Sequence, residues 1–317
     1  MGADVGISVE SSAQSGRPSR PSLEIRLLGP LRISRDDVTL PLPASRKVRA
    51  LLAYLSLAPH AVSRSHLCEL LWEVPNDPRG ELRWCLSKIR GLVDEPGRRR
   101  VESQADTVGL DLRGCFVDAI EVARALAEID TIGAQGLRML NALFAGDFLD
   151  GLEMESSPAF NGWLIGQRRR FRGCHRRLLE HLVRGASEDE TLGYLEQWLE
   201  LDPFDLRVHE LLFNALAACD RIREGEEHVA AATRLFETEG LDYGVIREAW
   251  RSARARRASH AVTTVAPSDA ATDGAVIAPR RASVAIMPFL DCSAVAGVHG
   301  GIADALAHDV ITRLAKL

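Results

Sequence analysis

Side chains able to recognise nucleic acid are concentrated between residues 79 and 100. Over residues 78–93 the apolar positions recur at helical spacing, and the opposite face carries polar, basic and aromatic side chains. A guanidinium or ammonium group on such a helix can donate hydrogen bonds to guanine edges in the major groove or to phosphates. We therefore predict a helix that enters a DNA groove, with a binding set of Arg79, Arg83, Trp84, Ser87, Lys88 and Arg90.

Three consecutive arginines, Arg98, Arg99 and Arg100, follow this helix after a Glu-Pro-Gly turn. In a hairpin over 98–110 we expect them to grip the phosphate backbone or the minor groove. Arg46 and Lys47 begin an earlier helix, where free backbone N–H groups can also meet phosphates. Each phosphate contact would steepen the salt dependence of binding, with a slope of about −0.9 per contact.

These features also have purely structural interpretations. A charged outer face is ordinary for a solvated amphipathic helix, and an arginine triplet can be a solvated turn. Trp84 can stack on the hairpin or pack against a sheet instead of meeting DNA. A second basic stretch is best interpreted as a solvated helix face that pairs with acidic helices, the alternative being contact with nucleic acid or acidic polymerase subunits. It comprises Arg168, Arg169, Arg170, Arg172, Arg176 and Arg177.

The charge balance restricts how DNA binding can arise. The chain has 317 residues and a net charge of −5. Residues 22–111 hold 14 Lys and Arg against 12 Asp and Glu, so even this part is only mildly basic. DNA binding must therefore come from a local face and not from bulk charge.

Several classes of protein are excluded by what the sequence lacks. No run approaches the roughly 20 apolar residues that a membrane helix needs, and residues 1–21 lack the pattern of a secretory signal and are expected to be disordered. Six cysteines are scattered without a CxxC motif, which favours reduced thiols in the cytoplasm. His175 and His181 lie six residues apart, off one helical face, and no catalytic or phosphate-binding motif occurs. We expect a cytoplasmic protein with no membrane, metal or cofactor partner and no enzymatic activity.

The elements that position the candidate site follow from hydrophobic spacing and turn residues. Short strands are predicted first, then three helices, then a hairpin joined by Gln104-Ala105-Asp106. The predicted strands are 23–28, 31–33 and 38–42, the helices 45–58, 63–72 and 78–93, and the hairpin strands 98–103 and 107–112. This order predicts a winged helix-turn-helix domain over 22–112, preceded by a small sheet of the OmpR type.

The rest of the chain is predicted to be mainly helical. Helical hairpins over 113–257, with small residues at packing positions, are typical of tetratricopeptide-like pairs. Their predicted helices are 117–129, 133–144, 158–184, 188–201, 205–219, 222–238 and 243–256. A linker over 258–281 and a strand–helix unit over 282–317 complete the mainly α fold. That unit cannot close a core alone, so we expect the sequence to be a piece of a longer protein.

Five N-terminal segments carry a family resemblance. GPLRI, ASRKVRALLAYLSL, VSRSHLCELLW, LRWCLSKIR and DTVGLDL resemble, in order and spacing, the DNA-binding domain of the bacterial transcriptional activator family that includes the Streptomyces antibiotic regulatory proteins. The chain departs from the family at Gly80 and Trp84, where an asparagine and a polar amide are common. GDFLDGL, LELDPFDLRVHELLFNALA and GLDYGVIREAW resemble the activator domain that follows, and ASVAIMPFL resembles the start of a TolB-like domain.

The resemblance implies a transcriptional regulator, most simply an activator, that reads promoter repeats with helix 78–93 and wing 98–110. Its implied partners are double-stranded DNA, RNA polymerase holoenzyme and a second copy on direct repeats. The alternative is a tetratricopeptide-like interaction scaffold whose winged helix binds protein. A signalling enzyme that has lost its catalytic part is a third hypothesis. Convergence of Arg83, Lys88 and the arginines at 98–100 on one face would separate the first two.

Overall fold

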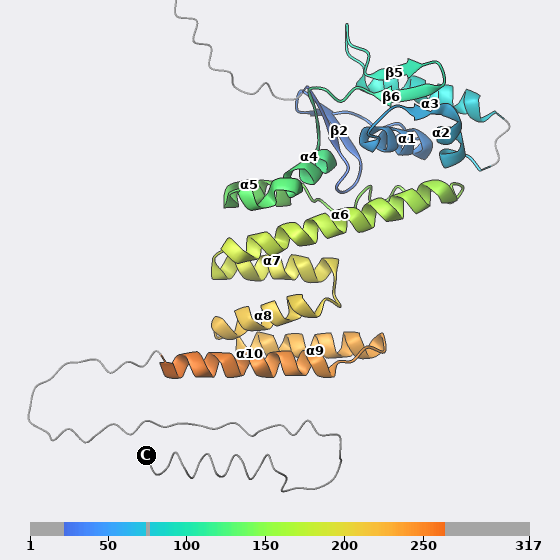
Figure 1. Ribbon diagram of the computed structural model, residues 1–317. Coiled ribbons are helices and arrows are strands. Elements are labelled where there is room, and N and C mark those ends of the chain that lie inside the picture. Colours follow the sequence, from blue (N-terminus) through green and yellow to red (C-terminus); the bar gives the residue numbers. More distant parts are fainter. Residues whose placement is uncertain (1–21, 74–76, 264–317) are drawn as a thin grey trace, which may run out of the picture. The chain divides into compact units, whose positions relative to one another are not determined.

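The computed structural model describes residues 22–73 and 77–263, whose path is shown in Figure 1. The predictions for residues 1–21, for the linker beyond 263 and for segment 282–317 lie outside the described residues. Within the described part the chain is mainly helical, with small sheets near its N-terminal end, which confirms the predicted fold class.

The first sheet combines the N-terminal strands with one later strand. Its order is β3-β2-β1-β7, with β1 antiparallel to β2 and parallel to β7. The strands are β1 (Leu23–Arg26), β2 (Arg32–Arg35), β3 (Val38–Thr39) and β7 (Cys115–Val117). Leu23 and Ile25 face the core while Glu24 and Arg26 are half-buried, as alternation requires. Strand β7 was not predicted, because its three residues begin just before a helix.

Three helices follow the sheet, and each begins where a capping side chain accepts a backbone N–H. Ser45 caps α1 (Arg46–Leu57), Ser63 caps α2 (Arg64–Leu71) and Asp77 caps α3 (Pro78–Val93). Pro78 occupies the first turn of α3, where its missing N–H has no cost. The apolar stripe of α3 is buried as predicted, with Leu82, Leu86, Ile89 and Val93 at 1% exposure or less.

The wing is a hairpin of β5 (Val101–Gln104) and β6 (Thr107–Leu110). The short strand β4 (Val62–Ser63) pairs with β6, so the wing is joined to the start of α2. At the tip of the hairpin, the Asp106 carbonyl accepts the backbone N–H of Arg64 at 2.7 Å. This sheet, in the order β4-β6-β5, packs beside α3 and completes the predicted winged helix.

Helices make up the described chain after β7. They are α4 (Asp118–Ala125), a 3-10 turn η1 (Leu126–Thr131), α5 (Ala134–Asn141), α6 (Pro158–Gly185), α7 (Glu188–Leu201), α8 (Leu206–Ala218), α9 (Ile222–Thr238) and α10 (Gly244–Thr263). Helix α6 contacts α5 and α7, α8 contacts α7 and α9, and α10 packs on both α8 and α9. Helix α10 continues to Thr263, so residues 258–263, which were predicted to belong to a linker, are helical.

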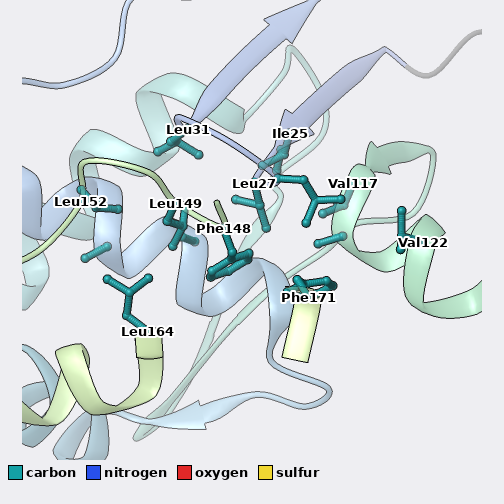
Figure 2. Close-up of a cluster of buried hydrophobic side chains, with 14 of the residues drawn as sticks. Ile25, Leu27, Leu31, Val117, Val122, Phe148, Leu149, Leu152, Leu164 and Phe171 are labelled. Carbon is teal, nitrogen blue, oxygen red and sulfur yellow. The ribbon is translucent and has the colours of Figure 1, made fainter. Parts of the chain in front are cut away.

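One hydrophobic core joins the first sheet to the helical region (Figure 2). Ile25 and Leu27 lie against Val117 and, through Phe148, against Phe171 of α6. The Ser157 hydroxyl also donates to the Leu71 carbonyl at 2.8 Å, which ties the loop before α6 to the end of α2. Strand β7 thus pairs with β1 across the predicted domain boundary at 112–113.

Candidate nucleic-acid interface

The exposed face of α3 presents two adjacent rows of side chains. Positions three and four residues apart lie above one another on a helix, so the sequence sorts into rows by spacing. One row is Arg79, Arg83, Ser87 and Arg90, and the other is Gly80, Trp84, Lys88 and Gly91. Every member is exposed or half-buried, in contrast to the buried stripe on the far side of the helix.

The first row lies toward the wing. Arg90 donates to the Ser103 hydroxyl on β5 at 2.9 Å, which fixes the wing-side edge of the face. Arg83 keeps 69% of its side chain exposed and approaches the Asp77 carboxylate only to 3.9 Å. Ser87 donates to the Trp84 carbonyl at 2.7 Å, so its hydroxyl oxygen can still accept. Arg83 is therefore available as a donor, as is Arg79, which is exposed at the start of the same row.

The second row borders a groove on the other side of α3. Trp84 is 49% exposed, and the Lys88 ammonium lies 5.5 Å from the centre of its ring. The groove has a volume of about 530 Å³ and lies between α3 and the segment at 40–45, with Leu40, Pro41 and Leu42 among its lining residues. Trp84 is thus neither stacked on the wing nor buried against a sheet, the two structural roles open to it from the sequence.

The N-terminal cap of α3 explains why position 80 is a glycine. The Gly80 N–H donates to the Asp77 carboxylate at 2.8 Å. A Cβ atom at position 80 would lie 2.0 Å from the other carboxylate oxygen. Gly80 therefore lets the cap lie directly over the first turn, at the place where the related family often has asparagine.

Arg100 is buried, so the prediction that it grips phosphates is wrong. Its side chain has 0% exposure and donates to Glu95 at 2.8 Å, to the Ser22 hydroxyl at 3.1 Å and to the Arg113 carbonyl at 3.1 Å. The hydrogen bond from Arg100 lowers the pKa of Glu95. A guanidinium without access to solvent cannot reach DNA, and here it joins the base of the wing to the start of the first sheet.

The two neighbouring arginines differ from each other. Arg98 donates to Asp111 at 2.9 Å and to the Arg113 carbonyl, which leaves 38% of its side chain exposed. Hydrogen bonds from Arg113 first, and then from Arg98, hold the pKa of the Asp111 carboxyl well below its usual range. Arg99 is exposed. Of the three arginines, Arg99 is therefore the one free to contact phosphate.

The two candidate residues at the start of α1, Lys47 and Arg46, lie in different surroundings. The Lys47 ammonium is 3.4 Å from Glu81 of α3 and 5.1 Å from the centre of the Trp72 ring. Glu81 also accepts a hydrogen bond from the Trp72 indole N–H. Arg46 instead donates to the Glu153 carbonyl at 3.2 Å, outside the α3 face. The structure therefore brings Lys47 to α3 but not Arg46.

One basic residue near the wing was missed by sequence reasoning. Arg64 is the first residue of α2, directly after the Ser63 cap, and its backbone is bonded to the tip of the wing. The signal available in the sequence was its position in the first turn of a capped helix, where free N–H groups gather. Burial raises the pKa of the nearby Cys68 thiol, and the charges of Arg79 and Arg64 act in the opposite direction.

Histidines, cysteines and carboxylates also occur elsewhere in the described residues. Among the described residues, no group of three or more His, Cys, Asp or Glu is placed to hold a metal ion. Five cysteines in this part of the chain are free thiols. None of the helices described is both long and apolar enough to cross a membrane.

Comparison with known proteins gave two findings. Residues 115–249 match the sequence model of the family described as bacterial transcriptional activator domain. Among solved structures, the chain is similar to Mycobacterium tuberculosis EmbR in complex with low affinity phosphopeptide, with 20% sequence identity and a TM-score of 0.52. That similarity covers 76% of this chain and 70% of the EmbR chain, which shows a shared fold. No curated protein matched the chain.

Proposed function

We propose that this chain, whose residues 115–249 match the bacterial transcriptional activator domain, is a transcriptional regulator that binds double-stranded DNA through α3. The observation that supports DNA binding most directly is the exposed double row on α3, with Arg83 and Lys88 free to donate. An exposed helix of this kind, flanked by a wing, fits the major groove. Trp84 supplies an apolar surface that can contact a thymine methyl group.

The remaining partners follow from the family. An activator acts by bringing RNA polymerase holoenzyme to a promoter, and we assign the protein contacts to the helical region. On direct repeats we expect two copies side by side. Such a regulator acts in the cytoplasm on chromosomal DNA and has no need of enzymatic activity.

A binding assay on genomic DNA fragments tests the DNA-binding role. We expect a subset of fragments to be bound more tightly than random DNA, with affinity falling as salt rises. The slope should be modest, because Arg100 is buried and Arg98 is paired within the protein. Equal affinity for every fragment would rule out specific regulation.

The scaffold alternative gains support from one observation. The arginines at 98–100 do not form one exposed patch with Arg83 and Lys88, since Arg100 is buried and Arg98 is bonded to Asp111. In that case the groove beside Trp84 would receive an apolar protein segment instead of DNA. A chain that binds no DNA at low salt, but whose protein partner is lost on Trp84→Ala, would favour the scaffold.

A further inference from the structure

A cleft lined with arginines lies along α6, away from the α3 face. Its volume is about 610 Å³, within the range of ligand-binding pockets. Arg168, Arg172 and Arg176 form one row at four-residue spacing, and Ile165, Arg169 and Gly173 form the next. Leu201 and Asp202, at the end of α7, form the opposite wall.

Arg168, at one end of the cleft, is bonded mainly within the protein. Arg168 is largely buried and donates to the Phe148 carbonyl at 3.0 Å and the Leu149 carbonyl at 3.1 Å. It also pairs with Glu153 at 2.6 Å. Arg168 therefore uses Nε and Nη2 within the protein and shapes the end of the cleft.

The other three arginines can still bind a ligand. Arg172 pairs with Asp147, yet 53% of its side chain stays exposed. Arg176 is 3.7 Å from Asp202 across the cleft, a loose contact with about half of each side chain exposed. Arg169 is exposed, and within residues 22–73 and 77–263 no ion-pair partner is found for it. The cleft thus holds guanidinium donors that its own carboxylates do not satisfy.

Apolar surface lies between these charges. Ile165 is 60% exposed, although it stands one turn from Arg169, and Leu201 is half-buried opposite. A Cβ atom at Gly173 would meet nothing within 4 Å, so the cleft is open along this part of α6. An anionic ligand that also carries an aliphatic group would match both kinds of surface.

We infer that this cleft binds an acidic peptide segment that presents carboxylates to Arg169, Arg172 and Arg176 and an aliphatic side chain to Ile165. Bidentate pairing of guanidinium with carboxylate gives such contacts direction as well as strength. A nucleic-acid backbone fits less well, because it offers no aliphatic side chain to Ile165 and Leu201. The inference names a partner for the protein-contact role proposed for the helical region, and it is independent of DNA binding by α3.

A pair of neighbouring variants tests the inference. The probe is a fluorescein-labelled synthetic peptide of glutamate pairs separated by leucine, measured by fluorescence anisotropy with the full chain. Arg169→Glu reverses a charge in the cleft, and Arg170→Glu reverses the next charge on the same helix, outside it. We expect Arg169→Glu to weaken binding roughly tenfold and Arg170→Glu to change it less than about twofold.

Two further measurements define the outcomes. A peptide with glutamine in place of glutamate should bind far more weakly, and Gly173→Leu, which fills the cleft without changing charge, should also weaken binding of the glutamate peptide. Equal losses in Arg169→Glu and Arg170→Glu, or no peptide binding at low salt, would overturn the inference. So would a DNA duplex of arbitrary sequence that binds in place of the peptide and is lost on Arg169→Glu.

The same experiment separates this inference from the proposed DNA binding. Both α6 variants should keep the wild-type affinity for genomic fragments, because neither residue lies on α3. Peptide binding without any preference among DNA fragments would support the peptide cleft and contradict the proposed role as a DNA-binding regulator. A preference among DNA fragments without peptide binding would support the DNA-binding role and contradict the peptide cleft.

Discussion

The carboxylate of Asp118 accepts the backbone N–H of Leu27 with both oxygens, at 2.8 and 2.9 Å. It also accepts from Leu28 at 3.0 Å and from Ala119 at 2.7 Å. Asp118 is completely buried, and burial raises the pKa of this carboxyl although the three N–H donors act in the opposite direction. One side chain at the start of α4 therefore holds the end of β1, which lies about ninety residues earlier in the chain.

Replacing Asp118 should destabilise the whole fold. In Asp118→Ala the N–H groups of Leu27 and Leu28 lose their acceptor, at about 1–3 kcal/mol for each buried group. We expect a loss of at least about 2 kcal/mol in the free energy of unfolding, measured by urea denaturation. Asp118→Asn keeps one carbonyl oxygen and should lose less. Equal losses in the two variants would show that the hydrogen bonds are not responsible.

Gly225 is required by the packing of α9 on α10. A Cβ atom there would lie 2.2 Å from the ring of Trp250, which is buried and cannot turn away. Gly225→Ala should lower the free energy of unfolding by about 1–3 kcal/mol. Gly193, in α7, has no neighbour within 4 Å of the same position, so Gly193→Ala should raise stability by up to about 1 kcal/mol. The check is the thermal unfolding of both variants. A Gly225→Ala protein more stable than the wild type would contradict close packing of Gly225 against Trp250.

Arg99 and Arg100 should behave oppositely on substitution. Arg100→Ala leaves Glu95 and two carbonyls without their partner, and should lower the free energy of unfolding by roughly 3 kcal/mol. Arg99→Ala should change stability by less than about 0.5 kcal/mol. If Arg99 contacts phosphate, its loss should reduce the salt slope of DNA binding by about one unit. Similar stabilities for the two variants would be inconsistent with a buried Arg100.

Arg83 should determine which DNA sequences are bound. Arg83→Ala should lose roughly 1–3 kcal/mol of discrimination between bound and random fragments while keeping the wild-type melting temperature. The measurement is competition between fragments at fixed salt. An unchanged preference would show that Arg83 is not a base-reading residue, and a uniform loss on all fragments would assign it to phosphate.

Stability should fall as the pH drops from about 6.5 toward 4. His175 stacks on Phe144 with 4.0 Å between ring centres, and burial lowers its pKa to about 4. Burial, and then the charge of His209, lowers the pKa of His228 to about 4 as well. Because both bases have a lower pKa in the folded chain, the unfolded chain takes up protons first, and stability is fully present only above about pH 6.5.

Urea denaturation at about pH 7 and at about pH 4.5 checks this dependence. His175→Gln removes one of the titrating groups and should reduce the loss of stability between the two pH values. His60→Gln, at an exposed position, serves as the control and should leave the loss unchanged. A pH dependence that is the same in all three proteins would contradict the role of buried histidines.

Local signals accounted for most of the fold, whereas contacts between distant segments did not show in the sequence. The first three helices and the buried stripe of α3 depend on neighbouring residues, and the ends of these helices were predicted to within one residue. Strand β7 depends on pairing with β1, and so escaped prediction.

The candidate site shows the same division. The exposure of α3 followed from helical spacing, but three identical arginines in a row carry no mark of which one is buried. Arg100 is the buried one because Glu95, Ser22 and the carbonyl of Arg113 accept its hydrogen bonds in the folded chain. Trp84 could be placed on the exposed face from spacing, but its groove depends on the segment at 40–45.

The pairing of β7 with β1 means that residues 22–112 are not structurally independent of the residues that follow them. A gene segment ending at residue 112 would encode a sheet without its parallel edge strand and without Asp118. That segment on its own, without residues 113–118, would therefore have an open sheet edge and two orphaned N–H groups. If α3 binds DNA as proposed, its sequence preference can change by substitutions on the two exposed rows of α3 without disturbing the contacts that join the first sheet to the helical region.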